Sequence, residues 1–311
     1  MKCLIVGGSG FIGANLLERL VPLNQHKITL FDLPNKQTDE IRKQFPQIEI
    51  YPYSFENQSK LAEAIEGQDV VVHLVHTTLP LNSSIDPIYD IKTNLIPTLN
   101  LIQLAHKFKI NRIIFSSSGG TVYGNASILP TPETHPTNPH CAYGISKLAI
   151  EKYLQFYGDL FGIETVTLRL SNPYGPGQRR DRQQGVVTKF LSNITSNKPI
   201  EIWGDGSVIR DFIYIDDVVD ALTEALTCPL QESQTILNVG TGVGTSLTNL
   251  VKELEITTGV KTQIKFHSAR PIDVPTNILD ISKIKNQLNF SPKFNLQEGL
   301  KIYWDKLKTQ K

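Results

Sequence analysis

The chain has 311 residues, with 31 basic and 30 acidic side chains and a formal net charge of +1. This length allows one large domain plus a smaller one, and the near balance of charge gives no global reason to expect a nucleic acid or a membrane as partner. Three widely spaced cysteines indicate neither a disulfide framework nor a metal site. No stretch approaches the roughly 20 apolar residues that span a bilayer, so we expect a soluble cytoplasmic protein without a signal peptide.

Short β-branched runs alternate with helical patterns through the first half of the chain. The runs that we predict as strands are residues 3–6, 28–31, 48–51, 69–75, 112–115 and 165–170. Apolar strands separated by helices predict an α/β fold, a doubly wound parallel sheet of the Rossmann type with its ligand at the carboxyl ends of the strands. In the helical pattern NLIPTLNLIQLA, Pro97 predicts a kink or a new helix start.

The stretch VGGSGFIG, between the first predicted strand and the first predicted helix, is typical of a dinucleotide-binding turn. Its glycines let the backbone approach a pyrophosphate, which then lies on the N-terminus of the helix. Asp32 ends the second predicted strand, where a carboxylate accepts hydrogen bonds from both ribose hydroxyls and repels a 2′-phosphate. We therefore predict NAD rather than NADP as cofactor. The predicted cofactor-binding residues here are Gly7, Gly10, Phe11, Ile12, Gly13 and Asp32.

The stretch YGISK places Tyr143 and Lys147 four residues apart, on one face of a predicted helix. A nearby ammonium stabilises a phenolate and so lowers the pKa of a tyrosine from about 10 towards the working pH. The same lysine can hold the nicotinamide ribose. We predict that both residues are catalytic and that both contact the cofactor.

After residue 170 the pattern loosens into Pro/Gly-rich segments. We predict an NAD-binding domain over residues 1–170 plus about 208–240, and a smaller, discontinuous α/β substrate domain over about 171–207 plus 241–311. The basic run QRRDRQQGVV, with Arg179, Arg180 and Arg182, is interpreted as a solvated loop. His73 and His76 lie on opposite faces of a strand, so we predict no metal site.

Six stretches occur in the order that a known family shows: GGSGFIG, SSSGGTVYG, YGISK, RLSNPYGPGQ, GDGSVIRDFIYIDDVVDA and ARPIDVPTNILDISK. The chain resembles, over essentially its whole length, the extended short-chain dehydrogenases/reductases of the NAD-dependent nucleotide-sugar epimerase/dehydratase family, and UDP-glucose 4-epimerase-like members most. The resemblance implies NAD-dependent epimerisation of a nucleotide sugar, a UDP-hexose at C4, through a transient 4-keto intermediate. Alternatives are a reductase, C-5 epimerase or dehydratase of the same family, or a catalytically silent NAD-binding sensor or scaffold.

One departure concerns the hydroxyl that the family places beside its catalytic tyrosine. The family has Ser or Thr four residues before the tyrosine of VYG, where this chain has Gly119. We predict that Ser118 takes the role, with Ser117, Thr121 or a water as alternatives. Family dehydratases carry an Asp-Glu pair where this chain has Gly120 and Thr121, so dehydration has no evident catalyst here.

On the substrate side, the resemblance assigns the nucleotide diphosphate to Asn172, Arg210 and Arg270, and guanidinium groups suit phosphates. Asn277 matches the family position whose side chain decides which sugars fit. Its small size leaves room for an N-acetylhexosamine or a uronic acid.

Two further expectations come from the same resemblance. The stretch YPYSFENQ replaces a Gly-Asp pair that the family has near the adenine, where Ser54 and Phe55 can still hydrogen-bond and pack. Family members commonly form homodimers through two helices from each chain, which here correspond to residues 88–108 and 143–160.

Overall fold

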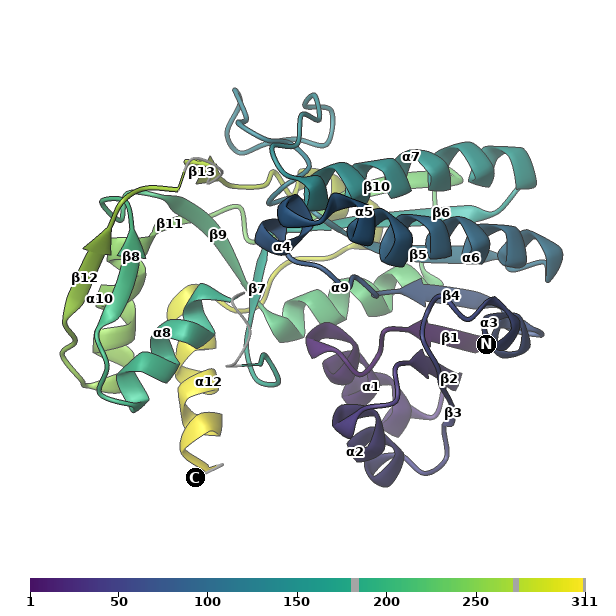
Figure 1. Ribbon diagram of the computed structural model, residues 1–311, viewed down its shortest axis with the longest axis horizontal. Helices are drawn as coiled ribbons and strands as arrows, with labels where there is room; N and C mark the ends of the chain where they lie inside the picture. Colours follow the sequence, from purple (N-terminus) through teal and green to yellow (C-terminus); the bar gives the residue numbers. More distant parts are fainter. Residues whose placement is uncertain (180–184, 271–273, 310–311) are drawn as a thin grey trace. The chain divides into compact units, whose positions relative to one another are not determined.

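The computed structural model describes residues 1–179, 185–270 and 274–309, and the chain divides into two compact units (Figure 1). The first unit comprises Met1–Ser118, Pro139–Arg169 and Val219–Leu237, and the second comprises Gly119–Asn138, Leu170–Val218 and Asn238–Lys311. The assignment of one domain to NAD and the other to the nucleotide sugar, with the boundaries given above, stays a prediction.

Among the described residues, seven strands form the larger sheet in the order β10-β6-β5-β4-β1-β2-β3. The pairs β1–β2, β2–β3, β1–β4 and β4–β5 are parallel. The predicted fold class is confirmed. The strands are β1 (Lys2–Val6), β2 (Lys27–Asp32), β3 (Glu49–Pro52), β4 (Val70–His73), β5 (Arg112–Ser118), β6 (Glu164–Leu170) and β10 (Gln234–Val239).

The central strands are apolar because helices cover both faces of the sheet. All four residues of β4 are buried, as are Cys3 to Val6 in β1. The strand order reverses between β1 and β4, which is where doubly wound sheets bind ligands at their carboxyl edge. Strand β10 was not among the predicted strands, because its run QTILNV lies at the edge of the sheet and outside the alternating pattern of the first half.

The helices α1 and α9 are linked by an ion pair between Arg19 and Asp220. Figure 1 shows these two helices on one face of the sheet, and α6 and α7 on the other. The elements are α1 (Phe11–Leu23), α2 (Lys36–Gln44), α3 (Gln58–Ile65), α4 (Pro80–Ile85), α5 (Pro87–Asp90), η1 (Ile91–Leu95), α6 (Ile96–Lys107), α7 (Ala142–Phe161) and α9 (Ile215–Thr227).

Pro97 lies in the first turn of α6, directly after the π-helical segment η1. The backbone is already helical through Leu95, so the proline follows a change from π-helical to α-helical geometry rather than a non-helical cap. The sequence predicted a kink or a new helix start at Pro97, and an α-helical segment does begin there, although the helix is not interrupted. No helix in the described parts of the chain has the length and apolar character needed to cross a membrane.

In the second unit, β9 pairs with β7, β11 and β13, and β8 pairs with β12. The carboxylate of Asp211, in β9, is buried and accepts hydrogen bonds from Thr241 and Gly242. The elements are β7 (Asn172–Tyr174), α8 (Val186–Thr195), β8 (Ile200–Trp203), β9 (Ile209–Tyr214), β11 (Gly244–Ser246), α10 (Leu247–Thr258), β12 (Ile264–His267), β13 (Thr276–Asn277), α11 (Ser282–Leu288) and α12 (Leu296–Thr309).

Candidate active site

The glycine turn after β1 packs too closely for larger side chains. A Cβ on Gly13 would lie 2.4 Å from the Cα of Gly8, and Gly7 has a φ of 87°. Gly10 caps α1, and no side chain of a described residue caps that end. Phe11 and Ile12 therefore begin the helix with backbone N–H groups that suit an anion.

Asp32 is the acceptor at the edge of this turn. Its Oδ2 accepts a hydrogen bond from the backbone N–H of Ser9 at 2.7 Å, and its Oδ1 accepts one from Leu33 at 2.7 Å. A carboxylate has about four acceptor positions, so both oxygens can still accept from a diol.

A hollow that is open to solvent lies beside Asp32. Its walls combine aromatic side chains with polar groups, as an adenosine would need. Ser54 and Phe55, expected near the adenine, both line it. Phe55 is otherwise a core residue, with its ring 5.1 Å from the ring of His73. The turn, the carboxylate and the hollow together fit an adenine dinucleotide.

Tyr143 and Lys147 lie in the first turns of α7. The Lys147 side chain is only 2% exposed, and its Nζ donates a hydrogen bond to the carbonyl of Ser116 at 2.8 Å. The same Nζ lies 4.7 Å from the centroid of the Phe115 ring and 5.8 Å from that of the Tyr143 ring. The helix thus places phenol and ammonium at the carboxyl end of β5.

The protonation of this pair differs from our expectation. Burial raises the pKa of Tyr143 above its ordinary value, and the neighbouring Cys141 and Asp90 raise it further. Burial also lowers the pKa of Lys147 to about 7, against the opposite pull of Glu151 and Asp90. The expected lowering of the tyrosine pKa by the lysine is therefore absent from the protein alone. Desolvation is the larger effect for both groups.

The three residues considered for the hydroxyl beside Tyr143, which are Ser117, Ser118 and Thr121, have different environments. Ser117 is buried, and its Oγ donates to the carboxylate of Glu151 at 2.5 Å, which Arg169 also binds at 2.6 Å. Ser118 is partly exposed, and no hydrogen bond joins its hydroxyl to another described residue. Thr121 has a buried Oγ1 with no partner in the described ranges. Of the three candidates, Ser117 alone is held by a buried ion pair.

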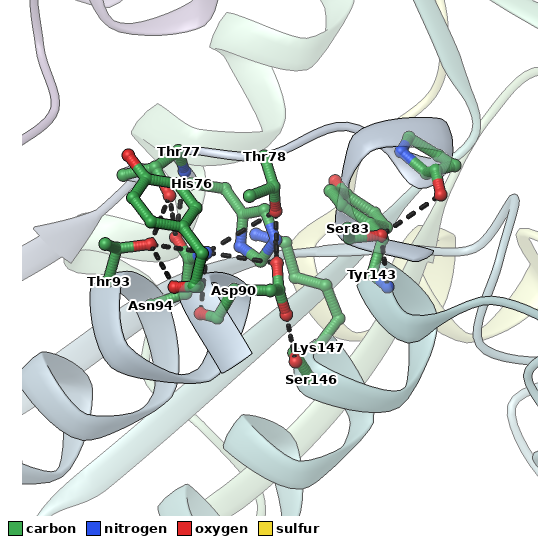
Figure 2. A network of polar contacts seen from close by, with 12 residues as sticks. His76, Thr77, Thr78, Ser83, Asp90, Thr93, Asn94, Tyr143, Ser146 and Lys147 are labelled. Atoms are coloured by element: carbon green, nitrogen blue, oxygen red, sulfur yellow. Dashed lines mark hydrogen bonds and ion pairs between the residues drawn. The ribbon is translucent and has the colours of Figure 1, made fainter. Parts of the chain in front are cut away.

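Sequence reasoning missed a polar cluster around Asp90 (Figure 2). Its carboxylate is fully buried and accepts hydrogen bonds from Thr78, Ser146 and Asn94, the last at 3.1 Å. His76 lies beside it, with its ring against that of Tyr143. From the sequence, His73 and His76 are predicted to be residues of one strand. His76 instead lies in the loop beyond the end of β4, so strand spacing could not indicate its contact with Asp90.

The second unit holds the residues predicted on the substrate side. In the sheet around β9, Asn277 is opposite Arg210 and Asn172 is opposite Phe212. The Nη1 of Arg210 donates to the carbonyl of Val274 at 2.7 Å, and Asn172 donates to that of Asp211 at 3.2 Å. The sheet register thus brings Arg210 and Asn277 together.

Arg270 is placed differently from Arg210. It is exposed, and its guanidinium carbon lies 3.8 Å from the centroid of the Trp203 ring, at the end of β8. In the basic run, Arg179 is exposed, while Arg180 and Arg182 lie outside the described residues. The role of Arg210 and Arg270 in binding the diphosphate stays a prediction, as does the interpretation of the basic run as a solvated loop.

Asn277 is 3% exposed, and its Nδ2 donates to the carbonyl of Gly119 at 2.8 Å. Its Oδ1 is buried and has no partner among the described residues. Asn277, the residue expected to border the sugar, is therefore in direct contact with Gly119, where the chain lacks the hydroxyl of the family's pattern.

A family model for the NAD dependent epimerase/dehydratase family matches residues 3–240. The chain belongs to this family. The cofactor of the family is NAD, as the glycine turn and Asp32 predicted.

Relatives in this family span the chain almost completely. A putative UDP-glucose 4-epimerase of Methanocaldococcus jannaschii is 35% identical and covers 97% of this chain and 98% of its own. A dTDP-4-dehydro-6-deoxyglucose reductase of Escherichia coli is 33% identical, covering 96% and 94%. The crystal structure of a UDP-glucose 4-epimerase of Thermotoga maritima with UDP-glucose has a TM-score of 0.94 and 32% identity, covering 100% and 99%. The predicted resemblance to UDP-glucose 4-epimerase-like proteins is confirmed.

The buried ammonium makes stability depend on pH. Lys147 has a pKa of about 7 in the folded protein and an ordinary value of 10.5, so the unfolded chain binds more protons between these values. The loss of folding free energy caused by burying this charged group is greatest below pH 7 and decreases as the pH rises. Between pH 7 and 9, the unfolding free energy of the nucleotide-free wild type should rise relative to Lys147→Met by up to about 1.4 kcal/mol per pH unit. Urea unfolding followed by circular dichroism measures this, and parallel pH curves would contradict the assignment.

Proposed function

We propose that this protein epimerises a UDP-hexose at C4 with NAD, through a transient 4-keto sugar. The observation that carries the proposal is the placement of Tyr143 and the buried Lys147 on α7, at the carboxyl end of β5. That edge of the sheet also carries the glycine turn and Asp32. Full-length similarity to UDP-glucose 4-epimerases supports the C4 reaction.

In this proposal Tyr143 accepts the proton of the sugar O4 and returns it at the end of the cycle. When bound, NAD supplies the centre that takes up and gives back a hydride. Lys147 stabilises the phenolate and holds the cofactor ribose. A phenol whose pKa is raised by burial needs added positive charge before it can act as a base at neutral pH. The buried, weakly basic Lys147 is the cation available to Tyr143 from its own helix.

The sugar must turn over between the two hydride steps, so the enzyme should hold the nucleotide firmly and the sugar loosely. We propose that Arg210, Arg270 and Asn172 bind the diphosphate. Asn277 would border the sugar, and its amide is tied to Gly119 rather than free to rotate. The similarity to a dTDP-sugar reductase makes a net reduction the second candidate. A reductase would consume reduced cofactor, whereas an epimerase leaves NAD unchanged.

The reaction is tested by proton NMR of the purified protein with UDP-glucose, UDP-N-acetylglucosamine and UDP-glucuronate, each without added reductant. A new anomeric signal at unchanged mass would identify the C4 epimer and the sugar. Tyr143→Phe should lower kcat by about 100-fold or more because the proton transfer is lost. Absence of turnover with all three sugars despite bound NAD would contradict the proposal. Oxidation of added reduced cofactor by a 4-keto sugar would favour the reductase.

The hydroxyl beside Tyr143 is tested by comparing neighbouring variants. Ser118→Ala should lower kcat by about 100-fold, since its hydroxyl is the one we assign to the substrate. Ser117→Ala should retain turnover and lower the unfolding free energy by about 1–3 kcal/mol, because the buried Glu151 carboxylate loses a donor. Thr121→Val keeps the shape and should leave kcat unchanged. Loss of turnover in Thr121→Val but not in Ser118→Ala would show that Thr121 supplies the hydroxyl.

We also propose that the protein is a homodimer. Exposed apolar side chains gather on the two segments predicted to form the interface, among them Ile88 (63%), Phe156 (58%) and Leu160 (62%). Apolar side chains this exposed along two neighbouring helices are typical of a surface that another copy covers. Analytical ultracentrifugation should show a dimer for the wild type and a monomer for Phe156→Glu. The control Ile256→Glu, on α10 with 65% exposure, should stay dimeric. A wild-type monomer, or a Phe156→Glu dimer, would contradict this interface.

A further inference from the structure

His76 is a buried histidine directly beside the proposed catalytic tyrosine. Its side chain is 7% exposed, and its ring centroid lies 4.4 Å from that of Tyr143, with the two rings at 72°. Its Nε2 lies 3.4 Å from Oδ1 of Asp90. A carboxylate can only accept, so a proton on Nε2 would point the ring at Asp90 across this contact. Both ring nitrogens are buried, and neither makes a hydrogen bond of ordinary geometry to a described residue.

Asp90 is held by groups from three parts of the first unit. Thr78 follows β4, Asn94 lies in η1, and Ser146 lies in α7 between Tyr143 and Lys147. Figure 2 shows these side chains converging on the Asp90 carboxylate, with His76 beside it. Burial raises the pKa of Asp90, but the contact with His76 and the hydrogen bonds from Ser146 and Thr78 outweigh this and hold it below its ordinary value. The group is therefore a buried anion at neutral pH.

The backbone of Tyr143 is fixed by the same region. Its N–H donates to Oγ of Ser83 at 2.8 Å, and that hydroxyl donates to the carbonyl of Pro80 at 3.1 Å. The main chain of Tyr143 is thus bound by α4, and its ring rests against His76. Among the described residues, His76 is the one whose ring packs against the Tyr143 ring.

We propose that Asp90 and His76 form a buried carboxylate–imidazole pair that positions the ring of Tyr143 for the reaction. His76 supplies the contact, and Asp90 supplies both the anchor for His76 and a fixed negative charge. This inference rests on the proposed role of Tyr143. It adds two positioning residues that act through that tyrosine.

The charges that face the pair are consistent with a neutral imidazole. Burial and the ammonium of Lys147 lower the pKa of His76 to about 4, although Asp90 opposes both. His73, on β4, is neutral as well, because burial lowers its pKa. Cys141, at the start of α7, is the remaining titratable neighbour of Tyr143, and burial raises its pKa. Asp90 is thus the fixed negative charge of the cluster at neutral pH.

The two members of the pair can be separated by substitution. Asp90→Asn keeps an oxygen for the His76 N–H but removes the charge. Since Asp90 raises the pKa values of both Tyr143 and Lys147, its loss should make both groups lose protons more readily. His76→Ala keeps the charge but removes the ring contact with Tyr143. If these residues had a purely structural role, both variants would be less stable than the wild type, and the pKa of Tyr143 would be unchanged.

The experiment is a titration of the purified protein labelled with carbon-13 at the tyrosine ring carbon that bears the hydroxyl. Tyr143→Phe assigns the Tyr143 signal. In Asp90→Asn the Tyr143 pKa should fall, because the carboxylate that helps to raise it has lost its charge. The control Asp86→Asn changes an exposed acid four residues away that caps α5, and it should leave the signal unmoved. An unchanged Tyr143 pKa in Asp90→Asn would overturn the proposal.

Turnover then tests the contact. In His76→Ala, kcat should fall about 10- to 100-fold, because the ring of Tyr143 loses its orientation, while KM for the nucleotide sugar stays within twofold of the wild type. His76→Phe restores an aromatic ring at this position and should recover part of kcat. Unchanged kcat in His76→Ala would overturn the positioning role. The NMR titration requires no turnover, so a shifted Tyr143 pKa in a protein without epimerase activity would uphold the coupling of Asp90 to Tyr143 and refute only the proposed reaction.

Discussion

The burial of one ammonium group governs the arrangement of the candidate active site. Lys147 is almost fully enclosed, yet it lies on a helix that must dock against the end of β5. A buried charge is tolerated only with compensating partners. Lys147 has the carbonyl of Ser116 in direct contact, and the carboxylates of Glu151 and Asp90 act on it electrostatically. The position of Tyr143, one helical turn before Lys147, follows from this docking.

Charge compensation also explains the division of work among the three serines at the end of β5. Ser116 uses its carbonyl to bind Lys147, and Ser117 uses its hydroxyl to bind Glu151. Glu151 is in turn neutralised by Arg169, in β6, so the buried charges alternate from α7 into the sheet. Two of the three serines are thus engaged in holding buried charge. The third, Ser118, ends the strand with its hydroxyl available for the chemistry that we propose.

In the second unit, a hydrogen bond joins Gly119 to Asn277, the residue expected to border the sugar. A glycine at residue 119 lacks the hydroxyl of the family's pattern, and its carbonyl binds the amide of Asn277. Asn277 also lies opposite Arg210 in the sheet, so the side chain expected to border the sugar and one expected to bind phosphate are held on paired strands. A substitution at residue 277 would remove the hydrogen bond to the backbone at residue 119.

The sequence by itself determined the fold class, the cofactor and the tyrosine–lysine pair, because each depends on local patterns. Apolar strands between helices, three glycines at a helix start, an acid ending β2 and a four-residue spacing on α7 are all readable along the chain. Only the tertiary structure decided the protonation of that pair, since desolvation depends on what packs over it. It alone also brought together Asp90, His76 and Tyr143, which come from α5, the loop after β4 and α7. Contacts between residues far apart in sequence leave no periodicity along it, so the polar cluster and the contact between Gly119 and Asn277 became visible only in the folded chain.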